Sequence, residues 1–222
     1  MEIISAARAL EQEGYLIVRN ALSTERVLAL IHEVTCLEQQ FQAREASETD
    51  VYKVSATRVM IHDIDTHGLQ AIDELVSDDA CNHLLNEIVG GKMLRWTATY
   101  ANCKPGHPAL AFHTDYDPYG CVKYRPNHPS CLRVLYYLDD LNAEKSPLHI
   151  APRSHTFLHK DYQSDVLSNT LDVDIVSPTI ATGDMIVIDP RVIHGTGENN
   201  SDRVRRVIAI TYVPDWSRPL NA

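Results

Sequence analysis

Two histidines and one aspartate are the residues of this sequence whose types and spacing best suit metal chemistry. His113 and Asp115 are separated by a single residue, and His194 follows 79 residues after Asp115. In an extended segment, residues two apart point to the same side, so His113 and Asp115 could reach one ion. Two imidazoles and one carboxylate are the ligand set of a non-haem Fe(II) site with open positions for oxygen chemistry.

A His-x-Asp triplet alone can arise by chance, so the prediction of a metal site also depends on the context of His194. His194 follows an apolar segment at 185–188 and precedes Gly195, which suits a strand end at the mouth of a barrel. Thr196, two residues on, shares the face of His194. The sequence therefore predicts that His113, Asp115 and His194 bind one metal ion.

An adjacent pair of arginines lies on the next predicted strand. Arg205 and Arg206 must face opposite sides of it, so one of them faces the interior. An inward arginine is costly unless it is paired, and the carboxylate of a bound ligand could pair with it through two hydrogen bonds. The alternative is two solvated arginines that bond Glu198 or Asp202.

Composition limits the possible classes of protein. A net charge of −10 over 222 residues argues against nucleic-acid binding, which needs a concentrated basic face. The five cysteines include no CxxC pair, which favours reduced thiols in a cytoplasmic protein. The first ten residues contain no long apolar run, so neither a signal peptide nor a membrane span is expected. No linker or repeat interrupts the sequence, and we expect a single domain over residues 1–222.

Helical patterns dominate the first part of the chain and strand patterns the rest. Apolar spacing predicts helices over 3–13, from Ser23 as cap to Phe41, and from Ser77 as cap to Gly90. Segments rich in β-formers are found at 15–18, 94–101, 132–138, 175–176, 185–188 and 204–213. Helices followed by many short strands predict an α+β, mainly β fold: a double-sheet jelly roll with helices on one face.

A long proline-rich segment, residues 116–130, directly follows the His-x-Asp triplet, and we expect it to overhang the metal. A solvated loop is the simpler interpretation of this segment. The basic residues in and after it could instead steer an anionic substrate, and they are Lys123, Arg125, His128 and Arg133.

Several other residues allow both a structural and a functional interpretation. One of Tyr136 and Tyr137 could meet a co-substrate, but core packing is the simpler role for both. Asn102 and Lys104 could reach the pocket or be solvated. Structural or exposed roles are expected for His149, His155 and His159, and packing roles for Trp96 and Trp216.

Several segments occur in an order that is more specific than any one of them: residues 14–23, 113–115, 137–140, 146–155, 183–184, 194–197 and Arg205. Together they resemble the phytanoyl-CoA dioxygenase family of Fe(II)/2-oxoglutarate-dependent oxygenases, and the resemblance covers most of the chain. Two positions depart from the family pattern, because Ser146 and Arg153 stand where the family has glycine.

The resemblance implies a double-stranded β-helix, which is a cupin-like jelly roll. It implies that His113, Asp115 and His194 hold Fe(II), and that Arg205 and the Thr196 hydroxyl bind the distal carboxylate of 2-oxoglutarate. It further implies that O2 and 2-oxoglutarate are consumed, with release of succinate and CO2. Related halogenases lack the carboxylate ligand, so Asp115 favours hydroxylation of a small or medium-sized metabolite, or another oxidation such as desaturation, over halogenation.

Two alternatives remain at this point. The same ligands could serve a cupin-like metal-dependent isomerase or hydrolase that uses no 2-oxoglutarate, or the fold could be a non-catalytic binding protein. The presence of all three ligands argues against the second alternative. Substrate identity does not follow from the fold.

Overall fold

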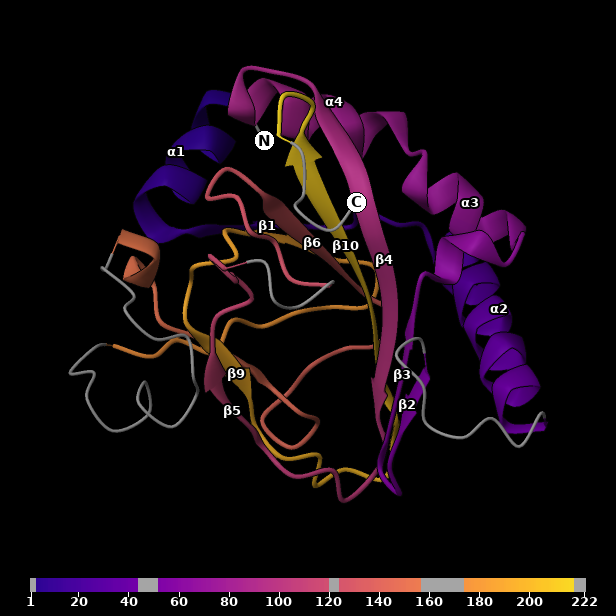
Figure 1. Cartoon of the computed structure of the whole chain (residues 1–222). Coiled ribbons are helices and arrows are strands. Elements are labelled where there is room, and N and C mark those ends of the chain that lie inside the picture. The colour runs from indigo at the N-terminus through magenta and orange to yellow at the C-terminus, as the bar shows by residue number, and fades with distance from the viewer. Residues whose placement is uncertain (1–2, 44–51, 120–123, 157–173, 218–222) are drawn as a thin grey trace.

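Two antiparallel β-sheets face each other, and helices cover the outer face of the larger sheet (Figure 1). The structure is a computed structural model that describes residues 3–43, 52–119, 124–156 and 174–217. The large sheet has the strand order β1-β8-β6-β10-β4-β3-β2, and the small sheet has the order β5-β9-β7.

The helices precede most of the strands in the chain. They are α1 (Ile3–Glu13), α2 (Thr24–Ala43), α3 (Gln70–Val76) and α4 (Asp79–Val89), with short 3-10 helices at Ile64–Thr66 and Ser154–Thr156. The strands of the large sheet are β1 (Tyr15–Val18), β2 (Tyr52–Val54), β3 (Arg58–His62), β4 (Met93–Cys103), β6 (Leu132–Tyr137), β8 (Met185–Ile188) and β10 (Arg205–Pro214). The small sheet contains β5 (Leu110–His113), β7 (Leu148–Ile150) and β9 (His194–Thr196).

Alternation along the central strands divides the interior into two layers. Residues of one parity, such as Tyr136, Ile208 and Ile210, pack with the helices in the first apolar core. Residues of the other parity, such as Leu135, Val207 and Ala209, face the small sheet. Successive side chains of a strand point to opposite faces, so one set of strands builds both layers.

The helix predictions are confirmed for α1 and α2, and the Ser23 hydroxyl accepts from the backbone N–H of Arg26 at 3.3 Å. The predicted cap at Ser77 is wrong. Its hydroxyl donates to the carbonyl of Asp73 at the end of α3, a helix that the sequence did not reveal. Asp78 caps α4 instead, with its carboxylate 2.9 Å from the N–H of Cys81.

The strand predictions missed β2, β3, β5, β7 and β9, and they assigned a strand to residues 175–176 where none forms. There the described chain forms only an isolated bridge between Val176 and Ile150. The packing role expected for Trp216 is also wrong, because its side chain is 64% exposed and meets the ring of His128 edge-on.

Ser146 and Arg153 have φ angles of 42° and 67°, in the left-handed region that glycine adopts most easily. They occupy the two positions where the resemblance predicts glycine, and they flank β7. These two turns therefore adopt the left-handed backbone conformation with residues other than glycine.

No helix in the described ranges is long and apolar enough to cross a membrane. Within those ranges Cys36, Cys81, Cys103 and Cys131 are free thiols.

Candidate metal centre and cavity

The structure brings His113, Asp115 and His194 together at one end of the small sheet. Each offers one ligand atom, and these atoms lie within 4.8 Å of one another. His113 and His194 are register partners on β5 and β9. Asp115 follows β5 directly, and its backbone N–H donates to the carbonyl of Pro190 at 2.8 Å. The two carboxylate oxygens of Asp115 lie 3.8 Å and 3.6 Å from the Nε2 atoms of His113 and His194.

Backbone carbonyls orient both imidazoles. Nδ1 of His113 is 2.9 Å from the carbonyl oxygen of Ala111, and Nδ1 of His194 is 2.9 Å from that of Val192. A carbonyl oxygen can only accept, so each Nδ1 carries a proton, and in the neutral imidazole this leaves the lone pair on Nε2. This arrangement is typical of metal-binding histidines, whose second nitrogen fixes the tautomer and the ring orientation.

Gly195 keeps the two histidine strands close together. A Cβ built on this residue would lie 2.7 Å from the carbonyl oxygen of Leu110 on β5. Any larger residue would therefore push β9 away from β5 and separate His194 from His113.

The local electrostatics hold two of the ligands in their metal-binding protonation states. Burial raises the pKa of Asp115, but the Arg133 guanidinium, 3.2 Å from a carboxylate oxygen, and the two histidines lower it to about 2. Burial, together with the charge of His194, lowers the pKa of His113 to about 4. Near neutral pH Asp115 is therefore ionised and His113 is neutral, as metal coordination requires.

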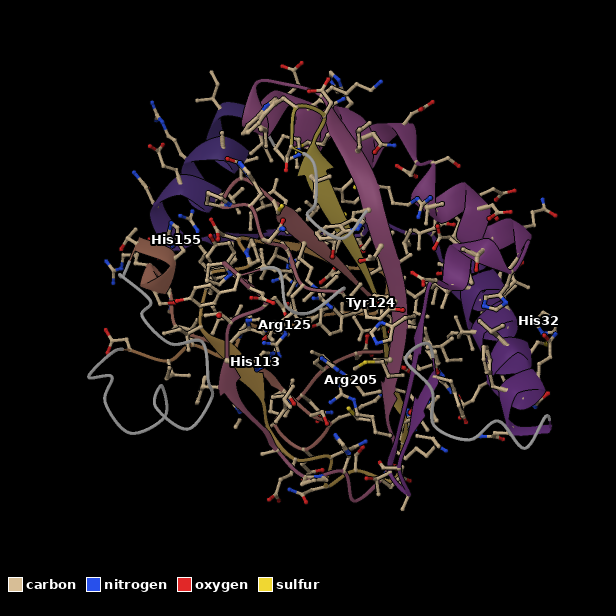
Figure 2. All side chains as sticks on the ribbon, viewed as in Figure 1. His32, His113, Tyr124, Arg125, His155 and Arg205 are labelled. Atoms are coloured by element: carbon tan, nitrogen blue, oxygen red, sulfur yellow. The ribbon has the colours of Figure 1, made fainter. Side chains whose placement is uncertain are left out.

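The ligands open onto a cavity of about 470 Å³ between the two sheets. His113, Arg125 and Arg205 all lie in this space between β5/β9 and β4 (Figure 2). Thr196 and Leu148 line the same cavity from the small sheet. A second hollow, of about 500 Å³, lies near Leu141, His149 and Pro178, and none of the three metal-centre residues lines it.

Arg205 is the inward member of the arginine pair. Its side chain is 6% exposed, and one guanidinium nitrogen donates to the Tyr137 hydroxyl at 3.3 Å. Its Nε is buried without a hydrogen-bond partner among the described residues. The Arg206 side chain turns to the other face, where its guanidinium donates to the Asp139 carboxylate at 3.1 Å. The cavity therefore holds a buried cation with unused hydrogen-bonding capacity.

A second arginine, Arg58 on β3, shares this end of the cavity. Cys103 on β4 is the register partner of both Arg58 and Arg205, so the two arginines lie in one row on the cavity face. The Nε of Arg58 is also buried without a hydrogen-bond partner in the described part of the chain. Arg58 was not predicted because β3 was not predicted; the short apolar run of Val59, Met60 and Ile61 was the available signal for this strand.

Of the residues that allowed both a structural and a functional interpretation, only some line the cavity. Tyr137 lines the cavity, whereas Tyr136 packs in the helix-facing core. Asn102 and Lys104 point away from the cavity and contact Glu38 at 2.9 Å and 3.5 Å.

The remaining histidines have the structural or surface roles that were expected, where the structure describes them. His155 lies 3.0 Å from the carbonyl of Glu11 and braces α1, and His149 contacts Ser177 at 2.7 Å. His159 and Lys123 lie outside the described residues. In the segment 116–130, Tyr124 and Arg125 reach the cavity beside His113.

Comparisons with known proteins agree with this architecture. The chain is 26% identical to "Dioxygenase trt7" of Aspergillus terreus (strain NIH 2624 / FGSC A1156), over 98% of this chain and 75% of that protein. Its fold matches AviO1 from Streptomyces viridochromogenes Tue57 with a TM-score of 0.78 and 21% identity, over 98% of this chain and 97% of that one.

A third match is the epimerase SnoN, solved in complex with Fe3+, alpha ketoglutarate and nogalamycin RO. It has a TM-score of 0.77 and 17% identity, over 96% of this chain and 83% of that one. These likenesses confirm the predicted jelly-roll fold.

The sequence model of the family described as Phytanoyl-CoA dioxygenase (PhyH) matches residues 10–207, which is most of the chain. The resemblance inferred from the motifs is thereby confirmed: this chain belongs to the phytanoyl-CoA dioxygenase family.

Proposed function

We propose that this protein is an Fe(II)- and 2-oxoglutarate-dependent dioxygenase that hydroxylates a C–H bond of a small or medium-sized molecule. One observation carries the proposal: the His113, Asp115 and His194 cluster shares a cavity with the buried, incompletely bonded guanidinium of Arg205. A three-residue metal centre and a carboxylate-binding cation are the two parts that this chemistry requires.

The donor set fits Fe(II). Two imidazole nitrogens with fixed tautomers and one ionised carboxylate would hold the ion on one side and leave its other positions open. When bound, iron and 2-oxoglutarate supply the oxidising chemistry, in which O2 is consumed and succinate and CO2 are released. The protein binds, orients and shields the reactants.

Arg205 would bind the distal carboxylate of 2-oxoglutarate. Its planar guanidinium can form two parallel hydrogen bonds with a carboxylate. The Tyr137 hydroxyl holds this guanidinium at the cavity wall, and the Thr196 side chain lines the cavity from the small sheet. Arg58, in the same row of the large sheet, would add a second positive charge to this end of the cavity.

The outcome of the oxidation is a separate part of the proposal. Asp115 retains a carboxylate ligand where a halogenase would need room for a halide, and this supports hydroxylation. The same fold in SnoN belongs to an epimerase, so product analysis has to accompany turnover measurements.

Anaerobic addition of Fe(II) and 2-oxoglutarate tests the proposal. We expect a visible metal-to-ligand charge-transfer band in the wild type, and succinate after O2 is admitted. Arg205→Ala should require far more 2-oxoglutarate for the same band, whereas Arg203→Ala, at an 80% exposed side chain, serves as the matched control. Absence of the band in the wild type would favour the isomerase or hydrolase alternative.

A further inference from the structure

The cavity contains more positive charge than iron and 2-oxoglutarate explain. Four guanidinium groups of the described residues line it, from Arg58, Arg125, Arg133 and Arg205, against the single carboxylate of Asp115. Arg133 pairs with Asp115, and Arg205 and Arg58 lie at the end proposed for 2-oxoglutarate. Arg125 is the cation without an assigned anion.

Arg125 lies beside the metal centre. Its side chain lines the same cavity as His113 and Asp115, and Figure 2 shows it next to His113. It lines the cavity between the sheets and makes no hydrogen bond or ion pair with another described residue (Figure 2). A partly buried guanidinium loses hydration, and an anion would restore its hydrogen bonds and also compensate its charge.

The residue before Arg125 is fixed to the wall of the cavity. The ring of Tyr124 stacks on that of His62, with centroids 3.8 Å apart and planes at 9°. The Tyr124 hydroxyl donates to Asp63 at 3.3 Å, and Nδ1 of His62 lies 3.0 Å from the Thr99 hydroxyl. Arg125 therefore extends from an anchored backbone, so less conformational entropy is lost when it binds a ligand.

We infer that the primary substrate carries an oxyanion, either a carboxylate or a phosphonate or phosphate, which pairs with Arg125 next to the metal. This inference rests on the proposed function, because 2-oxoglutarate must occupy the Arg205 end for Arg125 to select the second ligand. The guanidinium fork matches either acid group and does not match a neutral amide. The oxidised carbon then lies between the acid group and the metal.

Anaerobic isothermal titration calorimetry tests this assignment with Fe(II) present and 2-oxoglutarate saturating, at low ionic strength. The probes are 3-phenylpropanoate, 2-phenylethylphosphonate, which has the same two-carbon spacer, and the neutral isostere 3-phenylpropanamide. We expect at least one oxyanion to bind about tenfold more tightly than the amide, as one charge-assisted contact provides. The tighter of the two oxyanions identifies the acid group.

Variants locate the source of that preference. Arg125→Gln should reduce it to within about twofold, and Arg125→Lys, which keeps the charge but loses the fork, should retain an intermediate preference. Arg203→Gln removes a charge from an exposed side chain and should keep the full preference. The charge-transfer band of each variant shows whether its metal site has formed.

Equal affinities for acid and amide, no measurable oxyanion binding, or an unchanged preference in Arg125→Gln would overturn the inference. The band in the wild type separates the two proposals. Its absence refutes the proposed function and this inference with it, whereas a normal band without acid preference refutes the inference alone.

Discussion

The two faces of the large sheet are built from the same strands but differ in what satisfies their side chains. On the helix-facing side, Tyr136, Ile208 and Ile210 are at most 2% exposed and packed by the protein itself. On the cavity side, Arg58, Arg133 and Arg205 each keep a buried Nε without a partner in the described residues. Apolar packing dominates the first face, although the Tyr212 hydroxyl has no hydrogen-bond partner among the described residues, whereas the second face presents cationic groups to ligands. Substitutions on the first should change stability, and those on the second should change ligand affinity.

The largest effect is expected at the metal ligands. His194→Ala removes one of three donors, so iron binding and turnover should fall to background. Iron content after desalting and succinate formation measure the two losses. Full iron occupancy in the variant would show that His194 is not a ligand.

A core substitution should lower the stability of the fold and leave ligand binding unchanged. Ile210→Ala removes a fully buried side chain from the helix-facing layer and should lower the free energy of unfolding by about 2–5 kcal/mol. Urea denaturation of the metal-free protein measures this loss. The affinity for 2-oxoglutarate should stay within about twofold of wild type; a large change there with unaltered stability would contradict the division into two faces.

Arg205→Ala should mainly raise the 2-oxoglutarate requirement. Loss of a charge-assisted carboxylate contact corresponds to about 1.5–3 kcal/mol, or roughly a 10- to 150-fold increase in KM for 2-oxoglutarate. Steady-state succinate formation over a range of 2-oxoglutarate concentrations measures it, with Arg203→Ala as control. An unchanged KM would reject the role assigned to Arg205.

A smaller change of the same kind is expected for Thr196→Ala. A neutral hydrogen bond contributes about 0.5–1.5 kcal/mol, so KM for 2-oxoglutarate should rise roughly two- to tenfold. Thr196→Ser keeps the hydroxyl and should remain close to wild type. If serine and alanine behave alike, the contribution of Thr196 is packing.

Much of the difference between the two faces of the large sheet could be predicted from local sequence. The alternation of Arg205 with Arg206 required one arginine inside and one outside, and strand geometry alone implies this. His194 was predicted at the end of a strand, whereas it begins a separate strand, β9, in the small sheet. The family and the jelly-roll fold followed from the order of the motifs.

What the sequence could not provide depends on contacts between distant segments. The place of Arg58 follows from the pairing of β3 with β4 across Cys103, which no local pattern encodes. Ser77 and Asp78 are both suitable N-cap residues. The Ser77 hydroxyl donates to the carbonyl of Asp73 at the end of α3, and Asp78 therefore caps α4. The choice between Tyr136 and Tyr137 required the register of β6 against β10.

The protonation of the ligand groups affects how the metal is loaded. His113 already offers an unprotonated Nε2, and Asp115 already carries its negative charge, at any pH well above about 4. Capture of a divalent cation therefore releases no proton from either group, and hydrogen ions do not compete for these two donors near neutrality. Mild acidification of the surroundings should leave these two donors ready to capture iron.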